Sequence, residues 1–177
     1  MDAPPPLATR RATPRDAVRV HALLAAAGDA LAAHGFTNWI PAYPLEYVRR
    51  DIVERAVYVV ESRTPGATGT TAVGVFMLGA QPHRPYEAMP WAEPDAPAQY
   101  LNRMAIAPAW HGRGIGSWCL GEAARLARAA GARALRCDVY EPNARTRAFY
   151  ERGGFVARGT RSYGGRTFVS YELVLSP

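Results

Sequence analysis

The chain has 177 residues, of which 49% are hydrophobic, and its formal net charge is +6. This length and composition suit one globular domain with a sizeable core, so we expect a flexible tail over residues 1–6 and a single domain over residues 7–177. The sequence has no apolar run of about 18 residues and no secretory signal pattern at its start, which predicts neither a membrane span nor a membrane partner.

The charged residues and the cysteines limit which partners, which compartment and which metals we expect for the protein. The chain has no lysine, and its arginines favour anionic partners such as phosphates. Because no basic run or helix-turn-helix signature accompanies them, we expect no specific nucleic-acid partner. We interpret Cys119 and Cys137 as buried free thiols of a reducing, cytoplasmic compartment rather than as a disulfide. Two cysteines with scattered histidines give no zinc-ligand spacing, so no metal is expected.

The first half of the chain predicts two helices and three strands. Thr13 and Pro14 are typical of a helix start, and apolar residues from Val20 onward recur at helical spacing until Gly35 ends the helix. Two β-branched runs further along are typical of an antiparallel hairpin. A proline-rich loop over residues 81–98 follows, and loops of this length are usually functional or disordered. The expected elements are strand 7–11, helices 13–33 and 45–54, and strands 56–62 and 72–79.

The second half opens on the stretch from Tyr100 to Gly116, which predicts a buried strand, a proline-containing turn and a glycine loop that begins a helix. An amphipathic stripe of apolar residues continues this helix. Gly164 and Gly165 predict the two-residue turn of a final hairpin, because both are free to take a positive φ. The order of the elements predicts an α/β fold, a mixed sheet with helices on its faces. The expected elements are helix 114–130, strand 134–140, helix 143–152, and strands 155–163 and 166–175.

Gly112, Gly114 and Gly116 alternate where the third helix begins. Glycine lets backbone N–H groups approach a ligand without interference from a Cβ atom, and the first turn of a helix adds unpaired N–H groups and a positive dipole end. The loop therefore predicts a site for a phosphate or pyrophosphate. A dinucleotide-binding domain is excluded because Ser117 takes the third glycine position, and a P-loop is excluded because no Gly-Lys-Ser/Thr follows.

This loop and a second motif resemble the GNAT superfamily of acyl-coenzyme A N-acyltransferases. The family loop reads Gln/Arg-x-x-Gly-x-Gly/Ala, and here it reads His111-Gly112-Arg113-Gly114-Ile115-Gly116. The second motif of the family is matched here by Leu135 to Tyr140, Asn143, Ala144, Phe149-Tyr150-Glu151 and Gly154-Phe155. The resemblance implies a mostly antiparallel sheet of about seven strands, flanked by helices and splayed at its middle strands.

The resemblance also implies how acetyl-coenzyme A binds. The N–H groups of residues 112–116 contact its pyrophosphate, and the backbone of residues 104–106 pairs with its pantetheine arm like an added strand. His111 departs from the family's Gln or Arg. Asn143 caps a helix and, by resemblance, also contacts the coenzyme A arm or its adenine side. The implied cofactor-binding residues are Met104, Ala105, Ile106, His111, Gly112, Arg113, Gly114, Ile115, Gly116, Ser117, Asn143 and Tyr150.

Acetyl transfer to an amine needs a base, a donor to the oxyanion and an acid. Tyr150 aligns with the acid tyrosine of the family, since a phenol can protonate a thiolate; its alternative role is aromatic packing. A backbone N–H among residues 104–106 is the expected oxyanion donor, and Glu93 is our candidate base. The alternatives for the base are a water relay, an acceptor that arrives neutral, and the side chains of Asp95, Glu87, Asp138, His83 and His111.

We therefore expect an N-acetyltransferase that moves an acetyl group from acetyl-coenzyme A to a primary amine by direct attack in a ternary complex. The alternative is a non-catalytic acyl-coenzyme A-binding or sensor module. The acceptor is a small-molecule or peptide amine that the sequence does not identify. Trp39, Tyr43 and Trp91 are expected either to line its pocket or to close a core. The final hairpin offers a surface for a homodimer.

Overall fold

The computed structural model describes residues 6–63, 69–82 and 89–175. Most of the predicted tail, residues 64–68 between the strands of the first predicted hairpin, and part of the proline-rich loop, with His83 and Glu87, lie outside the described residues. The helices are η1 (Pro14–Asp16), α1 (Ala17–Ala32), α2 (Leu45–Glu54), η2 (Pro108–Trp110), α3 (Ile115–Ala129) and α4 (Ala144–Arg152). The strands are β1 (Leu7–Arg11), β2 (Ala56–Ser62), β3 (Thr71–Gly79), β4 (Ala98–Ile106), β5 (Ala134–Tyr140), β6 (Val156–Tyr163) and β7 (Arg166–Val174). The predicted elements and their order are confirmed, with small shifts at their ends.

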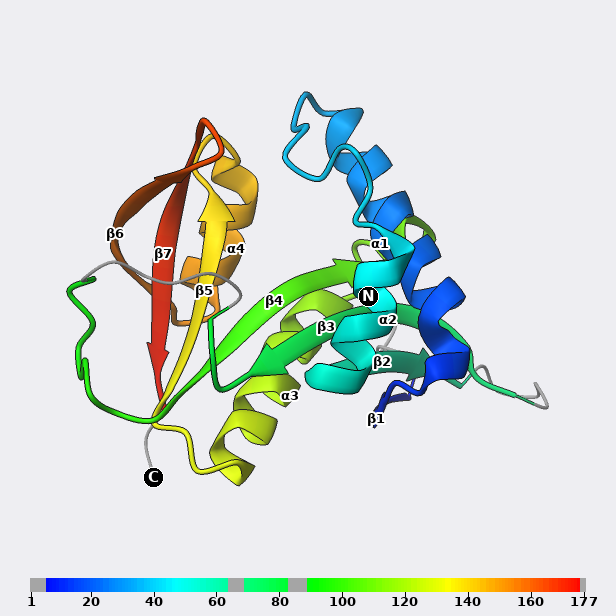
Figure 1. The fold of residues 1–177 in the computed structure, drawn as a ribbon, viewed down its shortest axis with the longest axis horizontal. Coiled ribbons are helices and arrows are strands. Elements are labelled where there is room, and N and C mark those ends of the chain that lie inside the picture. The colour runs from blue at the N-terminus through cyan, green and yellow to red at the C-terminus, as the bar shows by residue number, and fades with distance from the viewer. Residues whose placement is uncertain (1–5, 64–68, 83–88, 176–177) are drawn as a thin grey trace. The chain divides into compact units, whose positions relative to one another are not determined.

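The strands form one sheet of seven in the order β1-β2-β3-β4-β5-β7-β6 (Figure 1). β1 pairs antiparallel with β2, and β7 pairs antiparallel with both β5 and β6. β4 and β5 are parallel, which makes the sheet mixed, and α3 supplies the crossover that parallel neighbours require. Gly164 and Gly165 have φ of 54° and 70°, as the predicted turn between β6 and β7 requires. The predicted fold class is confirmed.

The chain divides into two compact units. The first contains the residues up to Met77 together with Arg103–Cys119, and the second contains Leu78–Asn102 together with the residues from Leu120 onward. β3, β4 and α3 each contribute residues to both units. The single domain expected over residues 7–177 stays a prediction.

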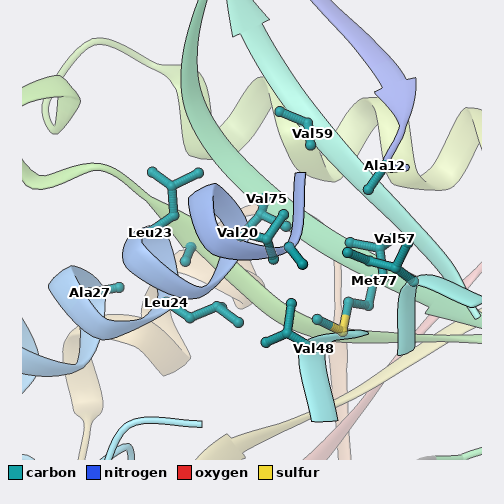
Figure 2. Close-up of a cluster of buried hydrophobic side chains, with 13 residues drawn as sticks. Ala12, Val20, Leu23, Leu24, Ala27, Val48, Val57, Val59, Val75 and Met77 are labelled. Carbon is teal, nitrogen blue, oxygen red and sulfur yellow. The ribbon is translucent and has the colours of Figure 1, made fainter. Parts of the chain in front are cut away.

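The core of the first unit lies where α1 and α2 pack against β2 and β3 (Figure 2). Val20 of α1 and Val48 of α2 are fully buried there against Val57 and Val75 of the two strands. Helical spacing and strand alternation place these side chains on the inner faces of their elements. Ala105 of β4 belongs to the same cluster, so the core holds the end of the strand that leads into the glycine loop.

The second unit buries a charged network in addition to apolar side chains. Glu172 of β7 is 1% exposed and accepts hydrogen bonds from Arg136 Nε at 3.1 Å, Arg158 Nε at 2.9 Å and the Ala92 N–H at 2.8 Å. The Trp91 ring centroid lies 4.5 Å from Arg136 Cζ. Because buried charges are tolerated only when they are paired, this network fixes the end of the proline-rich loop to the sheet. The Trp91 ring contacts this network, and its place in an acceptor pocket stays a prediction.

Candidate functional site

The turn that follows β4 is closed by its own hydrogen bonds. The Trp110 N–H donates to Ala107 O at 2.8 Å, and the His111 N–H donates to Pro108 O at 3.1 Å. His111 Nε2 lies 2.9 Å from Ile106 O, where it donates a further bond to the end of the strand. The His111 side chain thus holds the turn to β4. This role was not predicted from the sequence, where His111 stood out only because the family has Gln or Arg at its position.

The glycine loop takes a backbone conformation that its glycines make possible. Gly112 and Gly114 have φ of 76° and 75°, in the left-handed region that favours glycine. A Cβ atom added at either residue would meet no protein atom within 4 Å. The need for glycine therefore comes from φ and not from crowding within the protein. Residues 111–114 are exposed, whereas Ile115, at 1% exposed, anchors the start of α3 in the interior.

The N–H groups of the glycine loop differ from those of the turn before it, because they make no backbone hydrogen bond within the described residues. The Trp118 N–H donates to Gly114 O at 3.0 Å and closes the first turn of α3. Among the residues that the structure describes, no N–H group from residue 112 to residue 117 donates to a backbone carbonyl. The Arg113 guanidinium lies 4.8 Å from the Trp110 ring centroid and adds a positive charge. Exposed amides at the positive end of a helix suit a phosphate or pyrophosphate.

The last residues of β4 lie beyond its pairing with β5. That pairing covers three residue pairs, from Ala98 with Ala134 to Tyr100 with Arg136. On the β3 side, a Cβ atom added at Gly74 would lie 2.9 Å from Ala105 O, so glycine allows the two backbones to approach there. Residues 104–106 are therefore outside the register with β5, which is the condition for a ligand with amide groups to pair with them.

Asn143 precedes α4 and Tyr150 lies within it, and both belong to the second unit. Asn143 is 5% exposed, and its Oδ1 accepts the Thr146 N–H at 3.0 Å, which confirms it as the cap of α4. The Tyr150 side chain is 8% exposed. Its ring packs edge-on against Phe149 and Phe155, with both centroid distances 5.3 Å. A candidate acid thus sits in a packed aromatic environment, where its ring position is well defined.

Two candidate bases are held in ion pairs of the second unit. Glu93 pairs with Arg133 at 2.8 Å, next to the point where the Arg133 N–H donates to Pro97 O. Both bonds lie at the amino ends of β4 and β5, whereas the glycine loop follows the carboxyl end of β4. Asp138 is paired with Arg161 and accepts the Ser170 hydroxyl at 2.8 Å. Both carboxylates therefore have a charged partner, and a role of either as the base stays a prediction.

Two functional candidates, Arg103 and Asp51, were not predicted from the sequence. Arg103 is a charged residue within the apolar end of β4, and Asp51 lies on the buried stripe of α2 with Val48 and Ile52. A charged residue among apolar neighbours was the pattern in the sequence that could have identified both residues. Both contact Tyr43, directly or through its hydroxyl, and Tyr43 and Trp39 pack against the core of the first unit.

Comparison with known proteins agrees with the fold. The model of the acetyltransferase (GNAT) family matches residues 23–155, which is more than half of the chain. The chain belongs to this family. It is an N-acetyltransferase by family and by fold, and the family uses acetyl-coenzyme A. No curated protein matches the chain by sequence.

Solved structures of GNAT proteins share its fold. An acetyltransferase from Streptococcus agalactiae has a TM-score of 0.80 at 18% identity, with 97% of this chain and 96% of that chain covered. One from Listeria monocytogenes has a TM-score of 0.75 at 21% identity, with 96% and 95% covered. The NatC complex bound to Gag peptide and coenzyme A has a TM-score of 0.67 at 14% identity, with 96% and 99% covered.

Three further observations bear on the sequence predictions. Cys119 and Cys137 are free and buried, as predicted. Within the described residues, no group of His, Cys, Asp and Glu side chains is arranged to hold a metal ion. None of the helices that the structure describes has the length and apolar character needed to cross a bilayer.

Proposed function

We propose that the chain transfers an acetyl group from acetyl-coenzyme A to a primary amine by direct attack in a ternary complex. The observation that carries this proposal is the set of N–H groups over residues 112–117, which donate to no backbone carbonyl within the described residues. Residues 112–114 of this set are exposed. Gly112 and Gly114, both left-handed, keep side chains away from these amides. The pyrophosphate of coenzyme A accepts their hydrogen bonds, and Arg113 adds charge to the same site.

The pantetheine arm then runs along β4. Its two amides pair with the backbone of residues 104–106, beyond the register with β5. The thioester carbonyl points at a backbone N–H of this segment, which stabilises the negative charge that develops when the amine attacks. His111 contributes indirectly, because its bond to Ile106 O ties the strand to the loop.

Proton transfer is assigned to Tyr150 and to water. The attacking amine must be neutral, since a lysine-like amine has a pKa near 10.4, and water removes its proton. Tyr150 protonates the departing thiolate, whose conjugate thiol has a pKa near 8.5. We keep Glu93 out of this scheme because its carboxylate is paired with Arg133, and Asp138 because its carboxylate is paired with Arg161.

Two measurements test the proposal, and neither requires that the acceptor be identified first. Isothermal titration measures the affinity for coenzyme A, and release of free thiol from acetyl-coenzyme A is followed over a panel of small amines and peptide N-termini. We expect micromolar binding and acceptor-dependent thiol release. A protein that binds acetyl-coenzyme A but releases thiol with no amine of the panel is the sensor module instead. A protein that does not bind it has another function.

Tyr150→Phe tests the acid. Phenylalanine preserves the packing against Phe149 and Phe155, so we expect a fall in kcat of tenfold or more with less than a twofold change in the Kd of coenzyme A. Tyr171→Phe is the matched control: burial, and then the bond to Glu151, raise the pKa of Tyr171 to about 12, and its hydroxyl donates to Glu151 at 2.7 Å. The control is expected to lose stability and to keep kcat. Unchanged kcat in Tyr150→Phe removes Tyr150 from the mechanism.

We also propose a compartment and an oligomeric state for the chain. The free thiols of Cys119 and Cys137 favour a reducing compartment, and we propose the cytoplasm. A homodimer through the hairpin of β6 and β7 stays a prediction that sedimentation analysis at micromolar concentration decides.

A further inference from the structure

Arg103 has an unusual backbone conformation for its residue type. Its φ is 49°, and it is the one non-glycine residue with positive φ among the residues that the structure describes. Side chains with a Cβ atom disfavour this region, so the surroundings of Arg103 must hold it there. The residue directly precedes residues 104–106, the backbone segment that the proposed function assigns to pantetheine and to the oxyanion.

The side chain of Arg103 is held by Tyr43. Arg103 Cζ lies 3.4 Å from the centroid of the Tyr43 ring, a close cation–π contact. The Tyr43 hydroxyl donates to Asp51 Oδ2 at 2.6 Å, and Arg55 Nε lies 3.6 Å from Asp51 Oδ1. Burial raises the pKa of Tyr43 and its bond to Asp51 raises it further, so the phenol stays protonated and keeps donating.

The chain of contacts from Arg103 to Arg55 is costly at its position. Asp51 is 1% exposed, and Tyr43 packs against the apolar core of the first unit. Apolar side chains would fill this space without the desolvation of a carboxylate. The buried carboxylate of Asp51 is therefore linked through Tyr43 to the strained backbone of Arg103, next to the segment that the proposed function assigns to the thioester. Strain that a structure maintains in this way is typical of functional positions.

We propose that Arg103 is a positioning residue for acetyl transfer, clamped by Tyr43 and Asp51. The clamp keeps Arg103 in the left-handed conformation and so sets the direction of the Met104 N–H and of the β4 backbone that follows. Through that backbone it aligns pantetheine and the thioester carbonyl. This inference rests on the proposed function, because it requires that coenzyme A pairs with residues 104–106.

Amide hydrogen exchange, resolved residue by residue with and without coenzyme A, tests the clamp. In the wild-type chain we expect coenzyme A to slow exchange both in residues 112–117 and in at least one amide of residues 104–106. Arg103→Ala loses the side chain but keeps the Cβ atom that disfavours positive φ. It should keep the protection of residues 112–117 and lose at least tenfold of the protection in residues 104–106.

Arg103→Gly separates the backbone from the side chain. Glycine adopts positive φ readily, so this variant should recover protection in residues 104–106 to within about threefold of wild type. Tyr43→Leu removes the ring without changing β4 and should resemble Arg103→Ala. Arg50→Ala is the matched control: Arg50 stacks on Tyr47 of the same helix at 4.7 Å, but next to no strained backbone, and it should behave as wild type.

Three outcomes overturn the clamp. One is Arg103→Ala with wild-type protection in residues 104–106. Another is Arg103→Gly with the same loss as Arg103→Ala, which would make the side chain itself the ligand contact. If Arg103→Ala does not fold, full protection of residues 104–106 in Tyr43→Leu overturns it as well. Absence of any protection in residues 112–117 of the wild-type chain refutes the proposed function itself, a result that differs from all three.

Discussion

The starts of α3 and α4 solve the same problem in opposite ways. Every helix begins with N–H groups that have no partner within it. At α4 the side chain of Asn143 accepts the Thr146 N–H at 3.0 Å, and the cap residue is 5% exposed. At α3 the preceding residue is Gly114, which has no side chain to offer, and the amides from residue 112 to residue 117 donate to no backbone carbonyl in the described chain.

The difference separates a helix start that serves stability from one that is open to a ligand. A capping side chain contributes about 1 kcal/mol to a helix. The chain forgoes that contribution at α3 and accepts two left-handed glycines in addition. A self-capped start cannot bind phosphate with the same donors. The contrast therefore predicts that changes at the start of α3 act on coenzyme A binding and that changes at the start of α4 act first on stability.

Gly114→Val is the strongest test of this contrast. Valine is strained at φ of 75°, and its branched side chain would stand between the amides and the pyrophosphate. We expect the affinity for coenzyme A, measured by isothermal titration, to fall about 100-fold, which corresponds to about 2.7 kcal/mol. Equal affinity in the folded variant would show that the loop is not the binding site.

Gly121→Ala is the matched control for that variant. Gly121 lies inside α3, has no positive φ, and a Cβ atom added there meets nothing within 4 Å. Alanine should stabilise the helix by about 0.5–1 kcal/mol and leave the affinity for coenzyme A unchanged. If both variants lost affinity equally, any substitution in or next to α3 would impair binding. The effect of Gly114→Val would then not identify the loop as the binding site.

A third helix start, at η1, is stabilised by the carboxylate of Asp16, so its contribution to stability depends on pH. Asp16 accepts hydrogen bonds from Arg10 Nη1 and Nη2, both at 2.8 Å, and from the Thr13 N–H, also at 2.8 Å. The bonds from Arg10, and then those from Thr13, hold the pKa of Asp16 well below its usual value of 3.8. A lowered pKa means that the carboxylate stabilises the fold above pH 4 and that this contribution is lost as the pH falls below that value.

Asp16→Asn should therefore cost about 2 kcal/mol of the free energy of unfolding at pH 7. The difference from wild type should shrink as the pH falls from 5 to 2, because the wild-type carboxylate becomes protonated. Urea unfolding at several pH values measures it. A difference that stays constant with pH would show that shape, and not charge, makes Asp16 important.

Short-range patterns in the sequence were sufficient to predict the helices and strands and the position of the glycine loop. The alternation of Gly112 and Gly114 lies within a few residues of the helix that it begins, and the cap at Asn143 is three residues from its partner Thr146. Such contacts follow from local geometry, so their residue types can be recognised without the fold. The order of strands and helices followed from periodicity in the same way.

Long-range pairing could not be predicted. Glu93 pairs with Arg133, which lies 40 residues further along the chain, and no local pattern indicates that contact. The side chain of Asp138 is paired with Arg161, which is 23 residues away. Tyr43, which precedes α2, contacts Arg103 across the core that α2 and β4 share. The charge of Arg103 is visible in the sequence, but neither this contact nor its positive φ has a local signal. The partner of a carboxylate is a property of the fold, so pairings of this kind could not be predicted from the sequence.

Substitutions of Asn143 test the start of α4, and their expected effects are the smallest of this series. Its Oδ1 caps α4, whereas the resemblance to GNAT enzymes gives its amide group a contact with coenzyme A as well. Asn143→Ala removes both, so we expect a loss of about 1 kcal/mol in the free energy of unfolding, and also weaker binding of coenzyme A.

Asn143→Asp separates the two roles, because aspartate caps a helix as well as asparagine but has no N–H donor. We expect this variant to unfold within about 0.5 kcal/mol of wild type while its affinity for coenzyme A falls several-fold, since a donor has become a negative charge. Thermal unfolding and isothermal titration on the same samples measure the two effects. If Asn143→Asp binds coenzyme A as tightly as wild type, Asn143 is a cap alone, and the start of α4 takes no part in ligand binding.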